Sequence, residues 1–122
     1  MEKYRQQIEG WKSAFTTPQE RTVEGEFIGA GEEFGEIAVA VKNYDGTKES
    51  KTELFEELAD GVIRLLGIAN AADRLHPFDE VVAAKINTLP KKYPPSKIKE
   101  YRRQGDTLPR AMKKCKSYFL KN

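Results

Sequence analysis

Apolar residues recur every three or four positions through most of this chain, which is the spacing of one face of an α-helix. The first such face predicts a helix over about residues 2–15 and is made of Tyr4, Ile8, Trp11 and Phe15. Further helices are predicted over about 26–43 and 51–73. No stretch alternates between apolar and polar residues for long enough to predict a sheet. The pattern therefore predicts an all-α protein.

The two long helices carry apolar faces that the spacing predicts to be buried. In 26–43 that face consists of Phe27, Ala30, Phe34, Ile37, Ala38 and Val41. In 51–73 it consists of Leu54, Leu58, Val62, Leu65 and Ala69. Residues 16–25 are expected to form a connection. The alternative is that the helix begins as early as residue 18, because an N-cap, a first-turn proline and a capping-box glutamate are matched by Thr17, Pro18 and Glu20. Asp45 and Gly46 predict a turn between the two helices.

The last third of the chain reads as shorter elements. Pro77 predicts the start of a short fourth helix that runs to about Asn87. An extended linker is then predicted by three prolines, Pro90, Pro94 and Pro95. A short basic helix is expected over 96–105, and Thr107 is expected to cap a final helix. The apolar face of that final helix is Leu108, Ala111, Met112, Cys115 and Phe119.

Length and composition favour one intracellular domain. A chain of 122 residues buries about two thirds of its unfolded surface when it folds, so we expect a single domain over residues 1–122. No apolar run approaches the roughly 18 residues of a membrane span, and the start of the chain lacks the apolar core of a signal peptide. We therefore expect a soluble, cytoplasmic protein with no membrane partner. The single cysteine, Cys115, excludes an internal disulfide.

Charge is divided unevenly along the chain. The net charge is +2, but residues 91–122 carry 11 Lys or Arg against two acidic residues, so residues 1–90 are acidic overall. A basic segment attracts polyanions such as a triphosphate or a nucleic acid. The alternative interpretation is that these side chains only cover the solvent face of a terminal helix.

Acidic residues in the two long helices are spaced three apart, as Glu33 with Glu36 and Glu57 with Asp60. That spacing places both members of a pair on one helix face. Two antiparallel helices would aim all four carboxylates at one point, where like charges repel unless a cation neutralises them. Oxygen ligands select a hard ion, Mg²⁺ or Mn²⁺. An ordinary solvated acidic face is the alternative.

The full pattern is Glu32-Glu33-x-x-Glu36, then 20 residues, then Glu57-x-x-Asp60. It resembles the signature of the all-α nucleoside triphosphate pyrophosphohydrolases of the MazG type. The segments 31–41 and 56–66 are also similar to that family, as is Lys85-Ile-Asn87. The resemblance covers about residues 26–90 and leaves 91–122 as a basic extension. It implies a helical bundle around two acidic helices that is completed by oligomerisation, as a homodimer or a tetramer of dimers.

The resemblance implies a Mg²⁺-dependent enzyme in which water attacks the α-phosphorus of a nucleoside triphosphate, releasing the monophosphate and pyrophosphate. It assigns metal binding and catalysis to Glu33, Glu36, Glu57 and Asp60, with Glu32 supporting or orienting them. One of the glutamates is expected to be the general base.

Substrate contacts are expected around these acids. Arg64 lies one turn beyond Asp60, where its guanidinium reaches a β- or γ-phosphate, unless it is a surface arginine paired with Asp60. Lys85 and Asn87 match positions that bind substrate in the family. Base recognition is expected from Trp11, by stacking, and from Asn70, although the helical spacing of Trp11 also suits a core residue.

Two rival interpretations stay open. One is a narrower relative that acts on dUTP, dCTP or phosphoribosyl-ATP, since the sequence does not identify the base or the sugar. The other is a non-catalytic helical module that binds nucleic acid through residues 91–122. The second is less favoured, because all four ligand positions of the signature are present.

Overall fold

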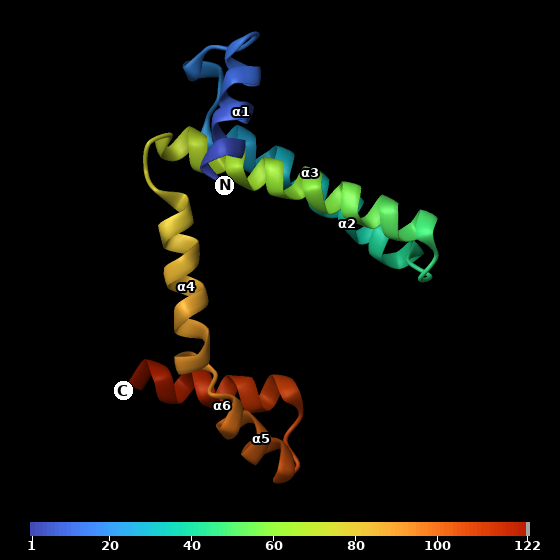
Figure 1. The fold of residues 1–122 in the computed structure, drawn as a ribbon, viewed down its shortest axis with the longest axis vertical. Helices are drawn as coiled ribbons and strands as arrows, with labels where there is room; N and C mark the ends of the chain where they lie inside the picture. Colours follow the sequence, from blue (N-terminus) through green and yellow to red (C-terminus); the bar gives the residue numbers. More distant parts are fainter. Residues whose placement is uncertain (122) are drawn as a thin grey trace. The chain divides into compact units, whose positions relative to one another are not determined.

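The structure is a computed structural model that describes residues 1–121, and Figure 1 shows its course. Its α-helices are α1 (Glu2–Ser13), α2 (Val23–Asn43), α3 (Lys48–Asp73), α4 (Phe78–Lys92), α5 (Pro95–Arg103) and α6 (Leu108–Lys121). A 3₁₀ turn, η1 (Pro18–Glu20), lies between α1 and α2. No strand forms in these residues, so the predicted all-α class is confirmed. No helix among them is long and apolar enough to cross a lipid bilayer.

Side-chain caps set where α2 begins. The predicted capping box forms, with Thr17 and Glu20 satisfying each other's backbone N–H groups, but it caps η1. Thr22 is extended, with φ −91° and ψ 155°, and its hydroxyl accepts a hydrogen bond from the Gly25 N–H at 3.0 Å. The alternative that α2 begins at residue 18 is therefore wrong, because a second cap starts the helix at Val23, within the segment predicted as a connection.

The turn predicted at Asp45 and Gly46 is present, and Gly46 adopts a positive φ of 84°. Thr47 caps α3 by accepting from the Ser50 N–H at 3.2 Å, so the helix begins three residues earlier than residue 51. The Asp45 carboxylate accepts hydrogen bonds from Thr47 and Ser50 at 2.7 to 3.0 Å. These hydrogen bonds, first those from Thr47, lower the pKa of Asp45 to about 2.

The predicted proline linker is wrong in its first half. Helix α4 continues through Pro90 to Lys92 instead of ending near Asn87. A proline removes only one hydrogen bond of the helical ladder, and the Tyr93 N–H donates to the Leu89 carbonyl at 2.7 Å just beyond it. The interruption before α5 is consequently short. The predicted cap of α6 is confirmed, since the Arg110 N–H donates to the Thr107 hydroxyl at 3.4 Å.

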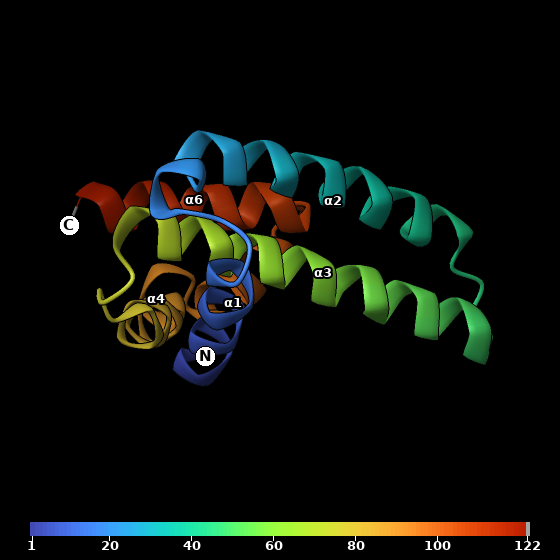
Figure 2. The ribbon, with the colours of Figure 1, turned by 90° about the horizontal axis from the view of Figure 1, so that it is seen from above.

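The chain divides into two compact units, of which the first is Met1–Phe78 and the second begins at Asp79. In the first unit, α2 and α3 form an antiparallel hairpin and lie side by side (Figures 1 and 2). Helix α1 packs against the C-terminal half of α3. In the second unit, α5 packs against α6. The predicted family core, 26–90, spans the boundary between the units.

The core of the first unit is small. Its buried apolar residues are Ile8, Ala30, Ala40 and Leu66. Much of the apolar face that was predicted to be buried is exposed, including Phe27 (65%), Phe34 (48%), Val41 (58%), Leu58 (41%), Val62 (45%) and Leu65 (45%). A hairpin of two helices covers only the strip along which they touch, and α1 crosses only part of α3. Helical spacing predicts which residues share an apolar face, but it does not predict how much of that face other helices of the same chain cover.

Candidate functional site

The antiparallel hairpin brings the acidic residues of α2 opposite those of α3. One carboxylate oxygen from each of Glu33, Glu36 and Glu57 lies within 4.8 Å of the other two. Glu33 and Glu57 are half-buried and Glu36 is exposed. Three of the four predicted ligands therefore gather at one point. We refer to Glu33, Glu36 and Glu57 as the acidic cluster.

Two oxygens of the acidic cluster are buried without a donor. Glu33 Oε2 and Glu57 Oε2 are shielded from solvent and accept no hydrogen bond from the described residues. A buried carboxylate oxygen that lacks a partner costs on the order of 1–3 kcal/mol, and a solvated acidic face would not contain such atoms. The acidic cluster therefore contains two carboxylate oxygens that a cation could contact.

The pKa of Glu33 is raised above its ordinary value. The largest cause is loss of solvent around the carboxyl group, followed by the negative charge of Glu36 and a hydrogen bond with it, and then by the charge of Asp60. Arg64 acts in the opposite direction. The neighbouring carboxylates therefore make Glu33 harder to ionise, and a cation at this point would relieve that repulsion.

The donor set fits a hard divalent ion. Opposite oxygens in a Mg²⁺ octahedron are about 4 Å apart, and the three carboxylate oxygens, all within 4.8 Å of one another, are close to the spacing that such an ion would require. The group does not include Asp60, which is exposed on the next turn of α3 but close enough for its charge to affect the pKa of Glu33. Glu32 is exposed and belongs to no such group in residues 1–121.

Arg64 lies beside the acidic cluster, and its contact with a phosphate stays a prediction. Its Nε is 3.6 Å from Glu33 Oε1, so Arg64 pairs with Glu33. The guanidinium rests over Gly29 of α2, where a Cβ would lie 2.8 Å from Nη1 and 3.1 Å from Cζ. Gly29 thus leaves the space that the guanidinium occupies. No pattern in the sequence indicates this role of Gly29, because the contact joins two helices.

An open pocket of about 810 Å³ begins at these residues and extends along α1. Its walls include Glu33, Asp60 and Arg64 from α2 and α3, and Tyr4 and Trp11 from α1. Trp11 is 63% exposed and meets Phe15 edge to face, with 4.9 Å between ring centroids. Trp11 is therefore not a core residue, and its ring is available for stacking. The volume lies in the range of pockets that hold small-molecule ligands.

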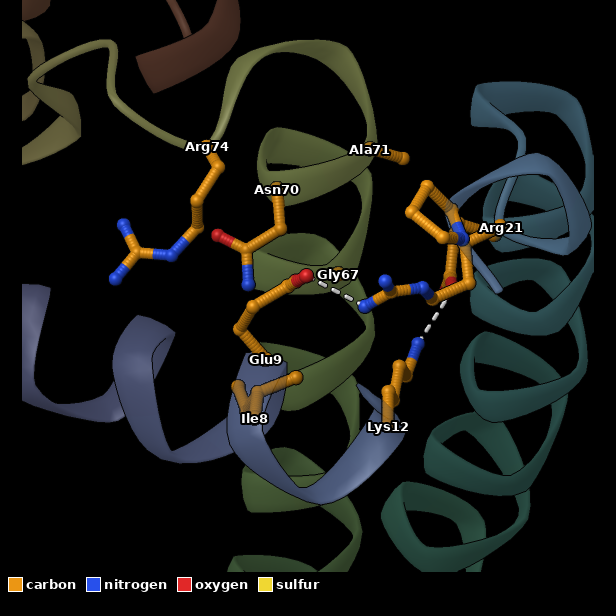
Figure 3. A pocket seen from close by; sticks show the side chains of 10 residues that line it. Ile8, Glu9, Lys12, Arg21, Gly67, Asn70, Ala71 and Arg74 are labelled. Atoms are coloured by element: carbon orange, nitrogen blue, oxygen red, sulfur yellow. Dashed lines mark hydrogen bonds and ion pairs between the residues drawn. The ribbon is translucent and has the colours of Figure 1, made fainter. Parts of the chain in front are cut away.

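A second pocket, of about 200 Å³, lies where α1, η1, α2 and α3 meet (Figure 3). Its charged side chains are largely paired with one another. Arg21 Nη1 is 2.6 Å from Glu9 Oε1, and Lys12 Nζ is 2.5 Å from Glu26 Oε1. Both ion pairs connect α1 to the segment that follows it. The polar groups of this pocket consequently hold α1 in place beside the first pocket.

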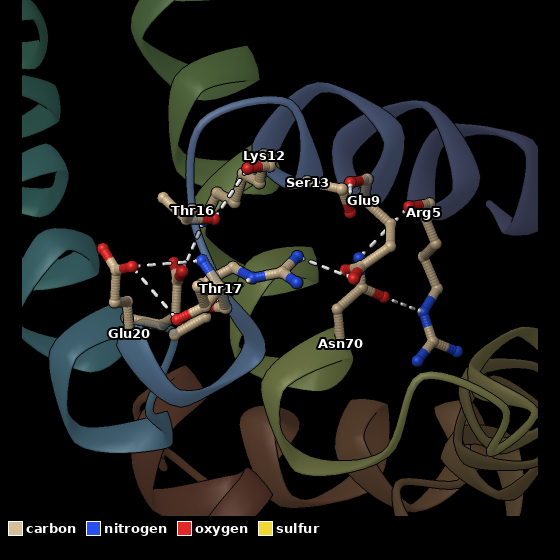
Figure 4. A network of polar contacts seen from close by, with 10 residues as sticks. Arg5, Glu9, Lys12, Ser13, Thr16, Thr17, Glu20 and Asn70 are labelled. Atoms are coloured by element: carbon tan, nitrogen blue, oxygen red, sulfur yellow. Dashed lines mark hydrogen bonds and ion pairs between the residues drawn. The ribbon is translucent and has the colours of Figure 1, made fainter.

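Asn70 lines this second pocket, and α1 occupies both ends of its amide (Figure 4). Its Oδ1 accepts from Arg5 Nε at 2.8 Å, and its Nδ2 donates to the Arg5 carbonyl at 3.1 Å. Arg5 is fully buried, and its guanidinium also donates to the carbonyls of Asp73 and His76 at the end of α3. The amide of Asn70 thus has a structural partner, and its contact with a base stays a prediction.

The remaining predicted residues lie elsewhere in the chain. Lys85 and Asn87 are exposed on α4, in the second unit, and their role also stays a prediction. The sequence patterns did not identify Tyr4, or the buried pair of Lys12 with Glu26, as residues of a functional site. Two periodic signals were available, because Tyr4 precedes Trp11 by seven residues and Glu26 precedes Glu33 by seven, which places each pair on one helix face.

Comparison with known proteins gives no independent indication of function. No protein-family model, no curated protein and no solved structure matches this chain. The resemblance to the MazG-type enzymes therefore rests on the motif residues, and what it implies about activity is taken up as a proposal.

Proposed function

We propose that the chain is a Mg²⁺-dependent nucleoside triphosphate pyrophosphohydrolase. The observation that carries this proposal is the pair of buried oxygens, Glu33 Oε2 and Glu57 Oε2, which lack a donor within the acidic cluster. Removing a carboxylate from solvent without a partner is unfavourable, and a divalent ion offsets the cost. Conversion of a nucleoside triphosphate to its monophosphate and pyrophosphate is the reaction that the motif resemblance implies for such a site.

In this proposal each residue has a defined part. Glu33, Glu36 and Glu57 hold the ion, and exposed Asp60 extends the acidic surface toward the pocket. A bound Mg²⁺ neutralises phosphate oxygens and lowers the pKa of a water ligand. Arg64 carries positive charge beside the cluster and pairs with phosphate oxygens of the substrate. Trp11 lines the same pocket and offers a flat, exposed ring to the base.

The reaction breaks the bond between the α-phosphorus and the oxygen that bridges it to the β-phosphate. The oxygen of the attacking water joins the α-phosphorus, and pyrophosphate leaves. A carboxylate that is not fully engaged with the ion accepts the proton from the water. Asp60 is suited to accept this proton because it is exposed and lies beside the acidic cluster without belonging to it.

We also propose that the enzyme works as a homodimer or as a tetramer built from dimers. The apolar faces of α2 and α3 remain open in one chain, with Phe27 and Phe55 each 65% exposed. A second copy of the hairpin presents the same faces, and isologous pairing would bury them. Light scattering at micromolar concentration is expected to give a multiple of 13.9 kDa. A mass of one chain would refute this assembly.

Product analysis with a panel of nucleotides tests the activity. Purified protein with Mg²⁺ is incubated with the common ribo- and deoxyribonucleoside triphosphates and with phosphoribosyl-ATP, and the products are separated. We expect monophosphate and pyrophosphate from at least one substrate, and no turnover in EDTA. The panel also decides between a broad enzyme and one restricted to dUTP, dCTP or phosphoribosyl-ATP.

A matched pair of variants ties the activity to the acidic cluster. Glu57→Gln removes a ligand charge and is expected to abolish turnover, whereas Glu53→Gln changes an exposed acid one turn earlier in α3 and is expected to leave it intact. Release of orthophosphate, absence of turnover on the whole panel, or full activity in Glu57→Gln would overturn the proposal.

A further inference from the structure

The second unit carries a row of cations on one face of α6. The cations are Arg110, Lys113, Lys114 and Lys121, and Ser117 and Tyr118 lie among them. Spacings of three or four residues align these side chains along the helix. Together with Tyr101 of α5 they line an open groove of about 510 Å³. We refer to this surface as the basic groove. It lies entirely within the second unit.

Packing of α6 on α5 fixes the direction of this face. Ala111 and Cys115 of α6 are buried. The row of cations is therefore held outward by a packed helix pair and is not a flexible tail. From Arg110 to Lys121 the row is about 16 Å long, which is much longer than a single phosphate group. Its length suits an extended polyanion.

The charges of the basic groove are only partly neutralised. Residues 79–121 contain 12 Lys or Arg against four Asp or Glu. Asp106 is the acid nearest the row, and it pairs with Lys114 at 2.6 Å and with Arg110 at 4.0 Å. Lys113 and Lys121 form no ion pair within residues 1–121. An incoming anion therefore meets cations whose charge is not already matched.

Aromatic rings flank the cations. Tyr118 is 67% exposed, and Tyr101 is half-buried with Lys114 Nζ 5.2 Å from its ring centroid. Flat rings beside cations suit a polymer that combines phosphates with unpaired bases, because bases stack on aromatic side chains while the backbone follows the positive charge. Stacking requires bases that are not already paired in a duplex. An acidic peptide would use the charges but not the rings.

We propose that the basic groove binds single-stranded nucleic acid, DNA or RNA, through contacts of Arg110, Lys113 and Lys121 with phosphates and stacking of bases on Tyr118. This binding is independent of the acidic cluster and of the hydrolase reaction. In this proposal the positively charged C-terminal segment binds a ligand different from the substrate of the hydrolase.

The test uses the full chain and fluorescently labelled oligonucleotides of about 15 nucleotides, oligo(dT) and oligo(U), with fluorescence anisotropy as the readout. EDTA is present throughout, so phosphates bridged by metal at the acidic cluster do not contribute. We expect saturable binding whose logarithm falls with the logarithm of salt concentration with a slope of about −2, since three phosphate contacts on a single strand each contribute about −0.7. The two oligonucleotides distinguish DNA from RNA.

Matched variants locate the binding site. Lys113→Glu is expected to weaken binding about tenfold or more, whereas Lys116→Glu makes the same charge change on the same helix outside the groove and should have a much smaller effect. Tyr118→Leu is expected to weaken binding roughly tenfold, and Tyr118→Phe to preserve it. Circular dichroism of each variant confirms that α6 still folds.

Four results would overturn this proposal. They are absence of binding at low salt, equal effects of Lys113→Glu and Lys116→Glu, equal competition by polyglutamate, and equal affinity for a duplex of the same length. None of them bears on nucleotide hydrolysis, which depends on other residues, so the two proposals fail separately.

Discussion

Gly29→Ala tests whether Arg64 must lie where the structure places it. A Cβ at residue 29 would be 2.8 Å from Arg64 Nη1, 3.1 Å from Cζ and 3.4 Å from Nε. Ordinary van der Waals contact begins at 3.4 Å, so the guanidinium has to move away from α2 by roughly half an ångström or more. The ion pair of Arg64 with Glu33, at 3.6 Å, lies at the same place and shifts with it.

The expected magnitudes separate function from stability. Alanine is about 1 kcal/mol more favourable than glycine inside a helix, and the displaced group is the end of a flexible side chain, so the stability of Gly29→Ala should stay within about 1 kcal/mol of the parent. Loss of the charged contact in Arg64→Ala should lower kcat/KM about ten- to a hundredfold. Because misplacement by about 1 Å can cost a large part of such a contact, we expect Gly29→Ala to lose roughly tenfold.

Steady-state kinetics and urea unfolding are measured on the same preparations. Gly35→Ala is the matched control, since it makes the same change in α2 where nothing lies within 4 Å of the added Cβ. It should stabilise the protein by about 0.5–1 kcal/mol and leave kcat/KM unchanged. In the Arg64→Ala background, Gly29→Ala should have no further effect on kcat/KM, because the side chain through which it acts is gone.

Two results would refute this reasoning. Unchanged kinetics in Gly29→Ala would show that the position of Arg64 is unimportant for the reaction. An equal loss in the presence and absence of Arg64 would show that Gly29 acts through something other than the guanidinium.

Three further predictions follow from the same contacts. Glu36→Gln removes a ligand and a like charge, so Mg²⁺ should no longer raise the melting temperature in scanning fluorimetry, while the metal-free melting temperature holds or rises; a Mg²⁺ response equal to that of the parent would remove Glu36 from the site. The pKa of Asp45 is lowered to about 2 from 3.8, so its stabilisation is complete above pH 3.8 and disappears as the pH falls through about 2. Asp45→Asn should therefore unfold at lower urea than the parent at neutral pH, with the difference closing in acid; a difference that does not depend on pH would contradict the lowered pKa. Gly67→Ala places a Cβ 2.8 Å from buried Glu26 Oε2 and 3.2 Å from Lys12 Nζ, so urea unfolding should show a loss of about 1–3 kcal/mol, and a gain like that of Gly35→Ala would show that the buried pair moves aside easily.

Local signals were sufficient to locate most elements. Apolar spacing, the turn at Asp45 and the cap at Thr107 act within a few residues, and the structure has a helix, a turn and a cap at those places. The errors arose where two local signals compete. Thr17 and Thr22 are both competent caps, and only the folded chain shows that the second one starts α2. Pro90 predicts a linker rather than a helix, but the loss of one backbone hydrogen bond does not end α4 there.

Three of the four predicted members of the acidic site gather in the structure, but their geometry was not predictable. Spacing by three placed Glu33 with Glu36 on one helix face, and antiparallel pairing of two helices was enough to predict that Glu57 would face them. The register of α2 against α3 decides which oxygens come within 4.8 Å of one another and leaves Asp60 outside that group. Register depends on contacts between residues far apart in the chain, such as Gly29 with Arg64.

By itself, the sequence determined the all-α class, the helical faces, the acidic motif and the separation of charge between the two parts of the chain. These properties follow from helix periodicity and from the identity of the residues, which need no partner. Only the tertiary structure decided which apolar side chains one chain covers, which carboxylate oxygens are buried without a donor, and that Arg5 is a buried guanidinium that ties α1 to the end of α3. Burial and pairing depend on two surfaces in contact, whereas the sequence pattern of a helix describes only the surface of that helix.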